Sequence, residues 1–153
     1  MTRLVRAGSG RAPTTTLVVC GAHLRGQPLN PFLMRLGAVY AGTSRTAPSY
    51  RMYALPPVTE ACSFPAATAR PGLVRQAHGG ASIEVELYEV PVAALGALLV
   101  TVAPPLAIGH LTLDDGTEPL GFVCETYGVA AGVDITDFGS WRNFLTLVPQ
   151  TQL

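Results

Sequence analysis

The sequence predicts a single α+β domain in which about six to seven strands form a small mixed sheet or barrel with three helices packed on it. Its 153 residues match the length of one domain, and 48% of them are hydrophobic. Short apolar or alternating segments, bounded by glycine and proline, predict the strands. Strand and helix patterns do not alternate along the chain in a repeating βαβ order, which argues against a doubly wound parallel sheet.

One helix and four strands are predicted before residue 76. An apolar run that stops at Gly21 predicts a buried strand, and Asn30 followed by Pro31 predicts the capped start of a helix that ends at Gly37. Several prolines and little periodicity predict a loop over residues 56–71. Apolar runs or alternation predict the strands of this part, which are residues 17–20, 38–44, 50–55 and 73–75.

The clearest strand is predicted over residues 82–89, where apolar and polar residues alternate. Its inward residues are expected to be Ile83, Val85 and Leu87, and its outward residues Glu84, Glu86 and Tyr88. A helix is predicted over residues 92–103 because prolines flank this apolar run. Residues 111–113 and 120–124 predict a hairpin around an Asp-Asp-Gly turn at 114–116.

The two ends of the chain differ in character. Residues 1–16 are rich in arginine, glycine and threonine, so we expect a flexible tail and no secretory signal. A last helix, capped by Asp134 or Thr136, is predicted to bury a face that includes Trp141 and Phe144. The domain is therefore expected to span residues 17–148. Met1 and the free tail favour a stand-alone gene product over an excised domain.

Composition excludes several classes of function. Ten arginines balance ten acids, so the net charge is zero and no basic face for nucleic acid is expected. Residues 90–109 carry no charge, but prolines interrupt them, and the apolar run between the prolines is too short to cross a hydrocarbon core about 30 Å thick. Three widely spaced cysteines favour the reducing cytoplasm. No metal-ligand spacing appears, and neither a metal nor a cofactor is expected.

The segment from Cys20 to Asn30 is the first candidate site. A buried strand runs into a glycine loop and then into a capped helix, and such a loop presents backbone amides that suit a carboxylate or an oxyanion. His23 lies in this loop and is a candidate proton donor near neutral pH. The alternative is that the glycines make turns and His23 packs or is solvated.

Arginine and acidic side chains supply further candidates. Arg45 and Arg75 follow or end predicted strands, where an arginine can hold a carboxylate with two hydrogen bonds. Glu84 and Tyr50 lie on strands and offer a carboxylate and a hydroxyl. The alternative is that the charged groups are solvated and that the tyrosine packs in the sheet. We expect His23 to share a pocket with Arg45 or Arg75 and with the loop amides.

Three blocks, followed by shorter ones, resemble a known family. They read LVVCGAHLRGQPLN over residues 17–30, TSRTAPSYRMYAL over 43–55 and RPGLVR over 70–75. Shorter blocks follow in the order IEVE, PLAIG, GFVCE and DITDFGSWR. The order and the sequences of these blocks resemble the C-terminal domain of allophanate hydrolase, over about residues 17 to 145. The resemblance implies a gamma-glutamylcyclotransferase-like fold, a small mixed β-barrel with helices around it.

The resemblance also implies a set of site residues. The loop from Cys20 to Leu24 corresponds to the substrate-cradling loop of the cyclotransferases, with Cys20 and Ala22 in place of a tyrosine and a serine. Those enzymes carry a catalytic glutamate in a stretch that here, over residues 103–109, contains no acid. His23 is the expected catalytic residue, and the expected substrate-binding residues are Cys20, Gly21, Ala22, Leu24, Arg45, Tyr50, Gly72, Leu73, Arg75 and Glu84.

Three functions stay open on this basis. The resemblance implies an enzyme or enzyme domain that decarboxylates N-carboxycarbamate, the product of an allophanate amidase. The first alternative is an amide-cyclising enzyme of the cyclotransferase type that acts on another substrate. The second is a non-catalytic module that supports assembly with an amidase. The expected partners are therefore a small carboxylated or amide substrate, an amidase-family protein and a second copy of the chain in a homo-oligomer.

Overall fold

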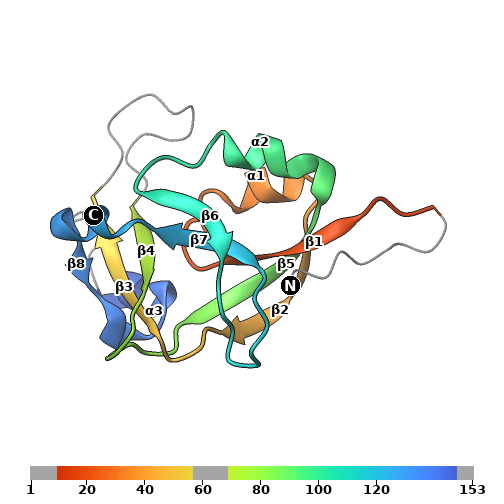
Figure 1. The fold of residues 1–153 in the computed structure, drawn as a ribbon. Helices are drawn as coiled ribbons and strands as arrows, with labels where there is room; N and C mark the ends of the chain where they lie inside the picture. Colours follow the sequence, from red (N-terminus) through yellow and green to blue (C-terminus); the bar gives the residue numbers. More distant parts are fainter. Residues whose placement is uncertain (1–9, 57–68, 148–153) are drawn as a thin grey trace.

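The computed structural model describes residues 10–56 and 69–147, and strands dominate these two stretches. The strands form one five-stranded and one three-stranded sheet (Figure 1). The larger sheet has the order β2 (Val39–Arg45), β5 (Glu84–Pro91), β1 (Thr14–Val19), β7 (Leu120–Cys124) and β6 (Leu106–His110). The smaller sheet has the order β4 (Arg70–Arg75), β3 (Tyr50–Leu55) and β8 (Val133–Asp134).

The larger sheet is mixed because β1 has neighbours of both directions. It pairs antiparallel with β5 and parallel with β7, while β2 with β5 and β6 with β7 are antiparallel pairs. Both pairs of the smaller sheet are antiparallel. The predicted α+β class is confirmed, and the described strands form two separate sheets rather than a closed barrel.

Short helices cover the ends of the sheets. In Figure 1, α1 and α2 lie together at the top of the view, and α3 lies at the lower left near β3 and β4. The helical segments are α1 (Asn30–Arg35), η1 (Val92–Ala94), α2 (Leu95–Leu99), η2 (Thr126–Ala131), η3 (Thr136–Phe138) and α3 (Trp141–Leu147). One core joins both sheets and α3, because Leu17 of β1, Met52 of β3, Leu73 of β4 and Trp141 of α3 belong to the same buried cluster.

Several predicted boundaries move in the structure. Strand β1 begins at Thr14, inside the expected tail, because it pairs with β5 as far as Pro91. The helix expected over residues 92–103 ends at Leu99. Strand β6 takes up Leu106–His110 instead of residues 111–113, since its partner β7 offers a ladder there. The rest of the expected tail, residues 1–9, and most of the expected proline-rich loop, residues 57–68, lie outside the described residues.

Two predicted helix caps are wrong. Asn30 is the first residue of α1, and its side chain bonds elsewhere rather than capping the helix. The last helix begins after Ser140, whose Oγ accepts the Asn143 amide at 3.1 Å. Asp134 instead holds the turn before it, where its Oδ1 accepts the amide and the hydroxyl of Thr136.

Strand β5 departs from the predicted division into an inward and an outward face. Glu86 and Tyr88, both expected to face outward, are buried, whereas Leu87 is only partly buried. Both faces are covered because the loop after β1 and helix α3 lie against the side that was expected to face solvent. A carboxylate therefore lies inside the protein next to the candidate loop.

No helix among the described residues is long and apolar enough to span a membrane.

Candidate functional site

The loop from Cys20 to Leu24 connects β1 to the turns before α1, and its carbonyl groups are occupied. The carbonyl of Gly21 accepts the Leu24 amide at 3.0 Å, and the carbonyl of Ala22 accepts the Leu29 amide at 2.8 Å. The side chain of Asn30 donates to the carbonyl of His23 at 2.9 Å. These bonds fold the loop back onto itself and hold it in one shape.

The backbone N–H groups at the start of the same loop differ from its carbonyl groups. Within residues 10–56 and 69–147, the backbone N–H groups of Gly21, Ala22 and His23 donate no hydrogen bond. Gly21 lies directly against Pro71 of β4, since a Cβ atom at Gly21 would stand 2.3 Å from Pro71 Cδ. Three successive unpaired amides next to a packed strand are candidate donors for a carboxylate or an oxyanion.

His23 lies in the interior with one ring nitrogen unpaired. Only 9% of the residue is exposed, and its ring stacks on Phe122 with centroids 4.8 Å apart and an interplanar angle of 21°. Nε2 is buried and has no hydrogen-bond partner among the described residues. Burial lowers the pKa of His23 from 6.5 to about 4, so the ring is neutral at pH 7. The ring therefore offers a proton-transfer group with a free position, in an apolar setting.

Most other predicted site residues of this region belong to the core. Cys20, Leu24, Tyr50 and Leu73 are buried, and burial raises the pKa of the Cys20 thiol to about 12, which makes it a poor nucleophile. Gly72 allows β4 to approach β7, because a Cβ atom there would stand 2.9 Å from Cys124. These residues shape the wall behind the loop.

The two predicted arginines donate to other parts of the protein. Arg45 donates to the hydroxyl and the carbonyl of Ser82, at 3.1 and 2.9 Å. Arg75 donates to the Tyr50 hydroxyl at 2.9 and 3.1 Å, to the carbonyl of His110 and to the hydroxyl of Thr112. The described residues contain no hydrogen bond from either guanidinium to the Cys20–Leu24 loop, so the pocket expected to unite them with His23 stays a prediction.

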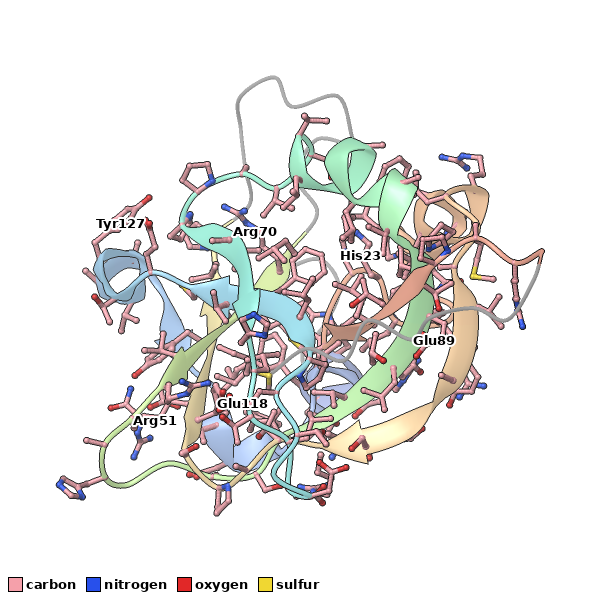
Figure 2. All side chains as sticks on the ribbon, turned by 45° about the vertical axis from the view of Figure 1, so that its right-hand side comes forward. His23, Arg51, Arg70, Glu89, Glu118 and Tyr127 are labelled. Carbon is pink, nitrogen blue, oxygen red and sulfur yellow. The ribbon has the colours of Figure 1, made fainter. Side chains whose placement is uncertain are left out.

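Glu84 and Arg70 begin strands β5 and β4. Glu84 is half-buried at the start of β5, where it is the register partner of Arg45. Arg70 begins β4, next to the proline that packs on Gly21, and donates to the carbonyls of Ala103 and Pro104 at 3.0 Å each. Figure 2 shows His23 in the interior below α2. An arginine thus holds the segment in which the cyclotransferases carry a catalytic glutamate and this chain has no acid.

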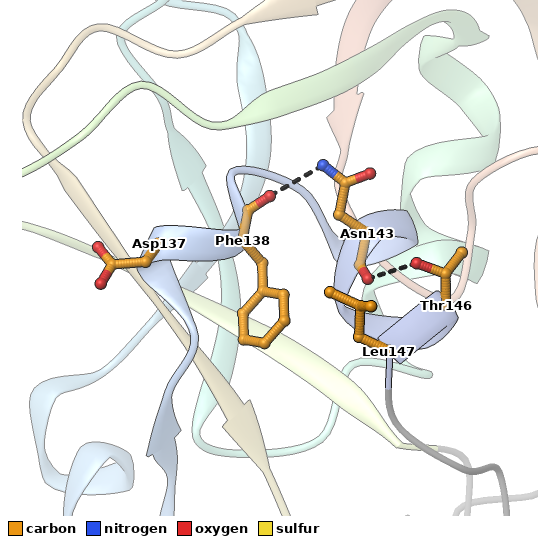
Figure 3. A pocket seen from close by; sticks show the side chains of 5 residues that line it. All are labelled: Asp137, Phe138, Asn143, Thr146 and Leu147. Carbon is orange, nitrogen blue, oxygen red and sulfur yellow. Dashed lines mark hydrogen bonds between the residues drawn. The ribbon is translucent and has the colours of Figure 1, made fainter.

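A hollow lies on η3 and α3. It has a volume of about 420 Å³ and is lined by Asp137, Phe138, Asn143, Thr146 and Leu147 (Figure 3). In Figure 3 the carboxylate of Asp137 points away from the other four side chains. These five residues include a carboxylate and no cation, so this hollow does not suit an anionic ligand. The loop that carries His23 is therefore the better candidate site.

Sequence reasoning missed the residues that hold the loop. Arg25, Arg142 and the buried Glu86 form an ion-pair cluster beneath it, and Phe122 supplies the surface on which His23 stacks. A weak signal existed for Glu86, because it is one of three acids on a single strand of a chain in which only 13% of residues are charged. Nothing local pointed to Arg142, which is 56 residues away from Glu86 along the chain.

Comparison with known proteins finds the same domain family in proteins of different lengths. A family model described as the allophanate hydrolase C-terminal domain matches residues 15–146. Urea amidolyase of Saccharomyces cerevisiae is 36% identical over 148 residues, which cover 92% of this chain and 8% of that protein. Urea amidolyase of Lachancea kluyveri is 34% identical over 139 residues, which cover 89% of this chain and 7% of that protein. The chain therefore spans less than a tenth of the length of these curated relatives.

Solved structures agree with these matches. Kluyveromyces lactis allophanate hydrolase superposes with a TM-score of 0.76 and 35% identity, over 86% of this chain and 21% of that one. A uropathogenic E. coli-specific protein superposes with a TM-score of 0.76 and 32% identity, over 89% of this chain and 98% of that one. An uncharacterised protein of Pyrococcus horikoshii, 17% identical with a TM-score of 0.60, shares the fold.

Proposed function

This chain belongs to the allophanate hydrolase C-terminal domain family, and from that premise we propose that it binds and decarboxylates N-carboxycarbamate. The substrate carries two carboxylates on one nitrogen. Its binding site is the loop from Cys20 to Leu24, and His23 is the residue that supplies a proton. An amidase that releases ammonia from allophanate supplies the substrate, either in the same polypeptide or as a separate partner.

One observation carries this proposal. The amides of Gly21, Ala22 and His23 donate no hydrogen bond within the described chain, and the buried Nε2 of His23 in the same loop is unpaired as well. Buried polar groups are nearly always satisfied in folded proteins, so a cluster of unsatisfied groups on one loop indicates a place for a polar ligand. Three donors side by side favour an anion.

The chemistry needs a proton at the substrate nitrogen. When one C–N bond of N-carboxycarbamate breaks, CO2 leaves, the electron pair stays on nitrogen, and a proton converts this nitrogen to the NH2 group of carbamate. The loop amides hold the remaining carboxylate. A dianion that enters the site raises the pKa of His23, because a negative charge nearby stabilises the imidazolium. His23 thus takes up a proton on binding and donates it from Nε2 as CO2 departs.

Malonate tests the binding step without turnover, because a methylene group replaces the reacting nitrogen. We expect malonate to bind to the loop and to raise the pKa of His23 above its free value of about 4. The complex then holds more protons than the free protein, so malonate affinity strengthens as the pH falls, by up to about tenfold per pH unit. Titration calorimetry at several pH values and the NMR shifts of the imidazole measure both effects.

The control for this experiment is His23→Gln, which keeps a polar side chain of similar reach but has no titrating ring. Any ionisation of malonate itself affects both proteins equally, so the difference in pH dependence belongs to His23. Identical pH dependence in the two proteins would show that the imidazole does not meet the ligand.

The cyclotransferase alternative needs a base for the attacking amine, and an acid such as Glu84 or Glu125 must then reach the loop. Glu86, which does bond the backbone after the loop, is held by two arginines, and within the described residues no hydrogen bond joins Glu84 or Glu125 to residues 20–24. We therefore expect no release of 5-oxoproline from gamma-glutamyl dipeptides, measured by chromatography at substrate concentrations in the millimolar range. Steady release that grows with protein concentration would show that another acid reaches the loop.

The assembly alternative is favoured by one finding, namely that the matched yeast relatives contain this domain as a small share of a much longer protein. A domain that only supports assembly would tolerate substitutions in the loop without loss of turnover. The His23 and Gly21 variants described in the Discussion separate the two functions.

A further inference from the structure

Glu86 is the most deeply buried acid that the proposed chemistry leaves unused. It lies on β5 with 4% of its surface exposed, and its carboxylate faces the loop after β1 and helix α3. Removing a carboxylate from water costs several kcal/mol unless partners replace the lost solvation. The partners of this carboxylate therefore show what it holds in place.

Both polar backbone groups of Arg25, two residues after His23, depend on this carboxylate. Glu86 Oε2 accepts the Arg25 amide at 2.9 Å. Glu86 Oε1 accepts Arg142 Nη2 at 2.8 Å, and the same Nη2 donates to the Arg25 carbonyl at 2.8 Å. The Arg25 side chain completes the cluster with a 3.3 Å contact from Nε to Oε1. The ion pair of Glu86 with Arg142 thus holds both the N–H group and the C=O group of Arg25.

A second chain of bonds links the same carboxylate to His23 itself. The Asn30 side-chain amide donates to the His23 carbonyl and to the Tyr88 hydroxyl, at 2.9 Å each. The Tyr88 hydroxyl donates in turn to Glu86 Oε2 at 3.4 Å. The loop is therefore attached to β5 at two points, the His23 carbonyl and the backbone of Arg25.

The charge state of Glu86 is consistent with this arrangement. Burial alone raises the pKa of Glu86, but hydrogen bonds from the Arg25 amide and from the Arg142 and Arg25 guanidinium groups outweigh burial and bring the pKa below its ordinary value. The carboxylate is therefore ionised at neutral pH, as a shared acceptor for these donors requires.

We propose that Glu86 is a positioning residue for the candidate site: through Arg142, Asn30 and Tyr88 it fixes the loop that aims His23 and the unpaired amides. This inference rests on the proposed function for its catalytic consequence, but the positioning itself is a property of the loop. Glu86 does not touch the ligand. Its loss changes the order of the loop first and turnover as a result.

Glu86→Gln tests the proposal, because it keeps the size of the side chain and removes the charge. The Arg25 N–H and the Arg142 guanidinium bond different oxygens of Glu86. Glutamine has one acceptor oxygen and its NH2 group only donates, so one of these two donors loses its acceptor. The matched control is Glu89→Gln on the same strand. Glu89 lies beside β1 (Figure 2), and its carboxylate accepts hydrogen bonds from threonine hydroxyls of β1 rather than from the loop.

Three readouts are expected to change in Glu86→Gln and not in Glu89→Gln. Exchange of the hydrogen-bonded amides within residues 21–30 accelerates by at least about tenfold, while the β3 and β4 amides keep their protection. The ring-current shift that Phe122 imposes on the His23 imidazole decreases. Malonate affinity falls by about tenfold. Arg142→Met leaves the contacts from Arg25 to Glu86 in place and is expected to give the same changes with smaller magnitude. This variant tests the proposal also if Glu86→Gln does not fold.

The outcomes separate this inference from the proposed function. If exchange over residues 21–30 and the His23 ring shift match wild type in both Glu86→Gln and Arg142→Met, the positioning role is overturned. If wild type itself neither binds malonate nor turns over N-carboxycarbamate, the proposed function fails, and the exchange and ring-shift measurements still decide the positioning role.

Discussion

His23→Ala is expected to lower the turnover of N-carboxycarbamate by about 10²–10⁴-fold, the usual contribution of a positioned proton donor. The substrate is generated during the assay by an allophanate amidase, and CO2 release is measured above the spontaneous rate. The fold is expected to survive. The His23 carbonyl keeps its bond to Asn30, and Nε2 has no partner among the described residues to leave unpaired.

The loss of packing must be separated from the loss of the nitrogen. His23 stacks on Phe122, so alanine removes an aromatic contact and is expected to cost about 1–2 kcal/mol of unfolding free energy. His23→Phe keeps a ring on Phe122 but has no nitrogen, and is expected to retain stability while losing turnover. His78→Ala, at an exposed histidine, serves as the control. Full turnover in His23→Phe would remove His23 from the chemistry and favour the assembly module.

Gly21→Ala is expected to destabilise the domain by about 1–3 kcal/mol, because the new methyl group has no space. A Cβ atom at this position would stand 2.3 Å from Pro71 Cδ and 2.6 Å from Pro71 Cγ. The ring of Pro71 belongs to β4 and is fixed by its pairing with Ala54, so the loop must move instead. A displaced loop no longer aligns its amides, and malonate affinity is expected to fall together with stability.

The matched control for this change is Gly96→Ala in helix α2, where a new Cβ atom would meet nothing within 4 Å. Alanine is the better helix former, so this variant is expected to be neutral or up to about 1 kcal/mol more stable. Urea unfolding measures both variants. A Gly21→Ala protein with the stability and malonate affinity of wild type would show that close packing on β4 does not set the shape of the loop.

Local pattern was sufficient for most of the elements and for the candidate loop. The apolar run before Gly21, the Asn-Pro helix start and the Asp-Asp-Gly turn each depend on a few consecutive residues, and the structure has a strand, a helix and a turn at these places. The alternation over β5 located that strand within two residues at each end. It placed Ile83 and Val85 correctly in the interior but missed the burial of Glu86 and Tyr88, because alternation presumes a solvent-facing side, and here both sides are covered.

What the sequence determined by itself is the order of most strands and helices, the α+β class, the family resemblance and a glycine loop that carries a histidine. Only the tertiary structure decided the surroundings of that loop. Glu86 meets Arg25 across 61 residues and Arg142 across 56, and Arg142 reaches the Arg25 carbonyl across 117. Backbone periodicity repeats over two to four residues and carries no information on such pairs. Whether a histidine is solvated or buried against Phe122, and which arginine meets which carboxylate, therefore depends on how distant strands pack.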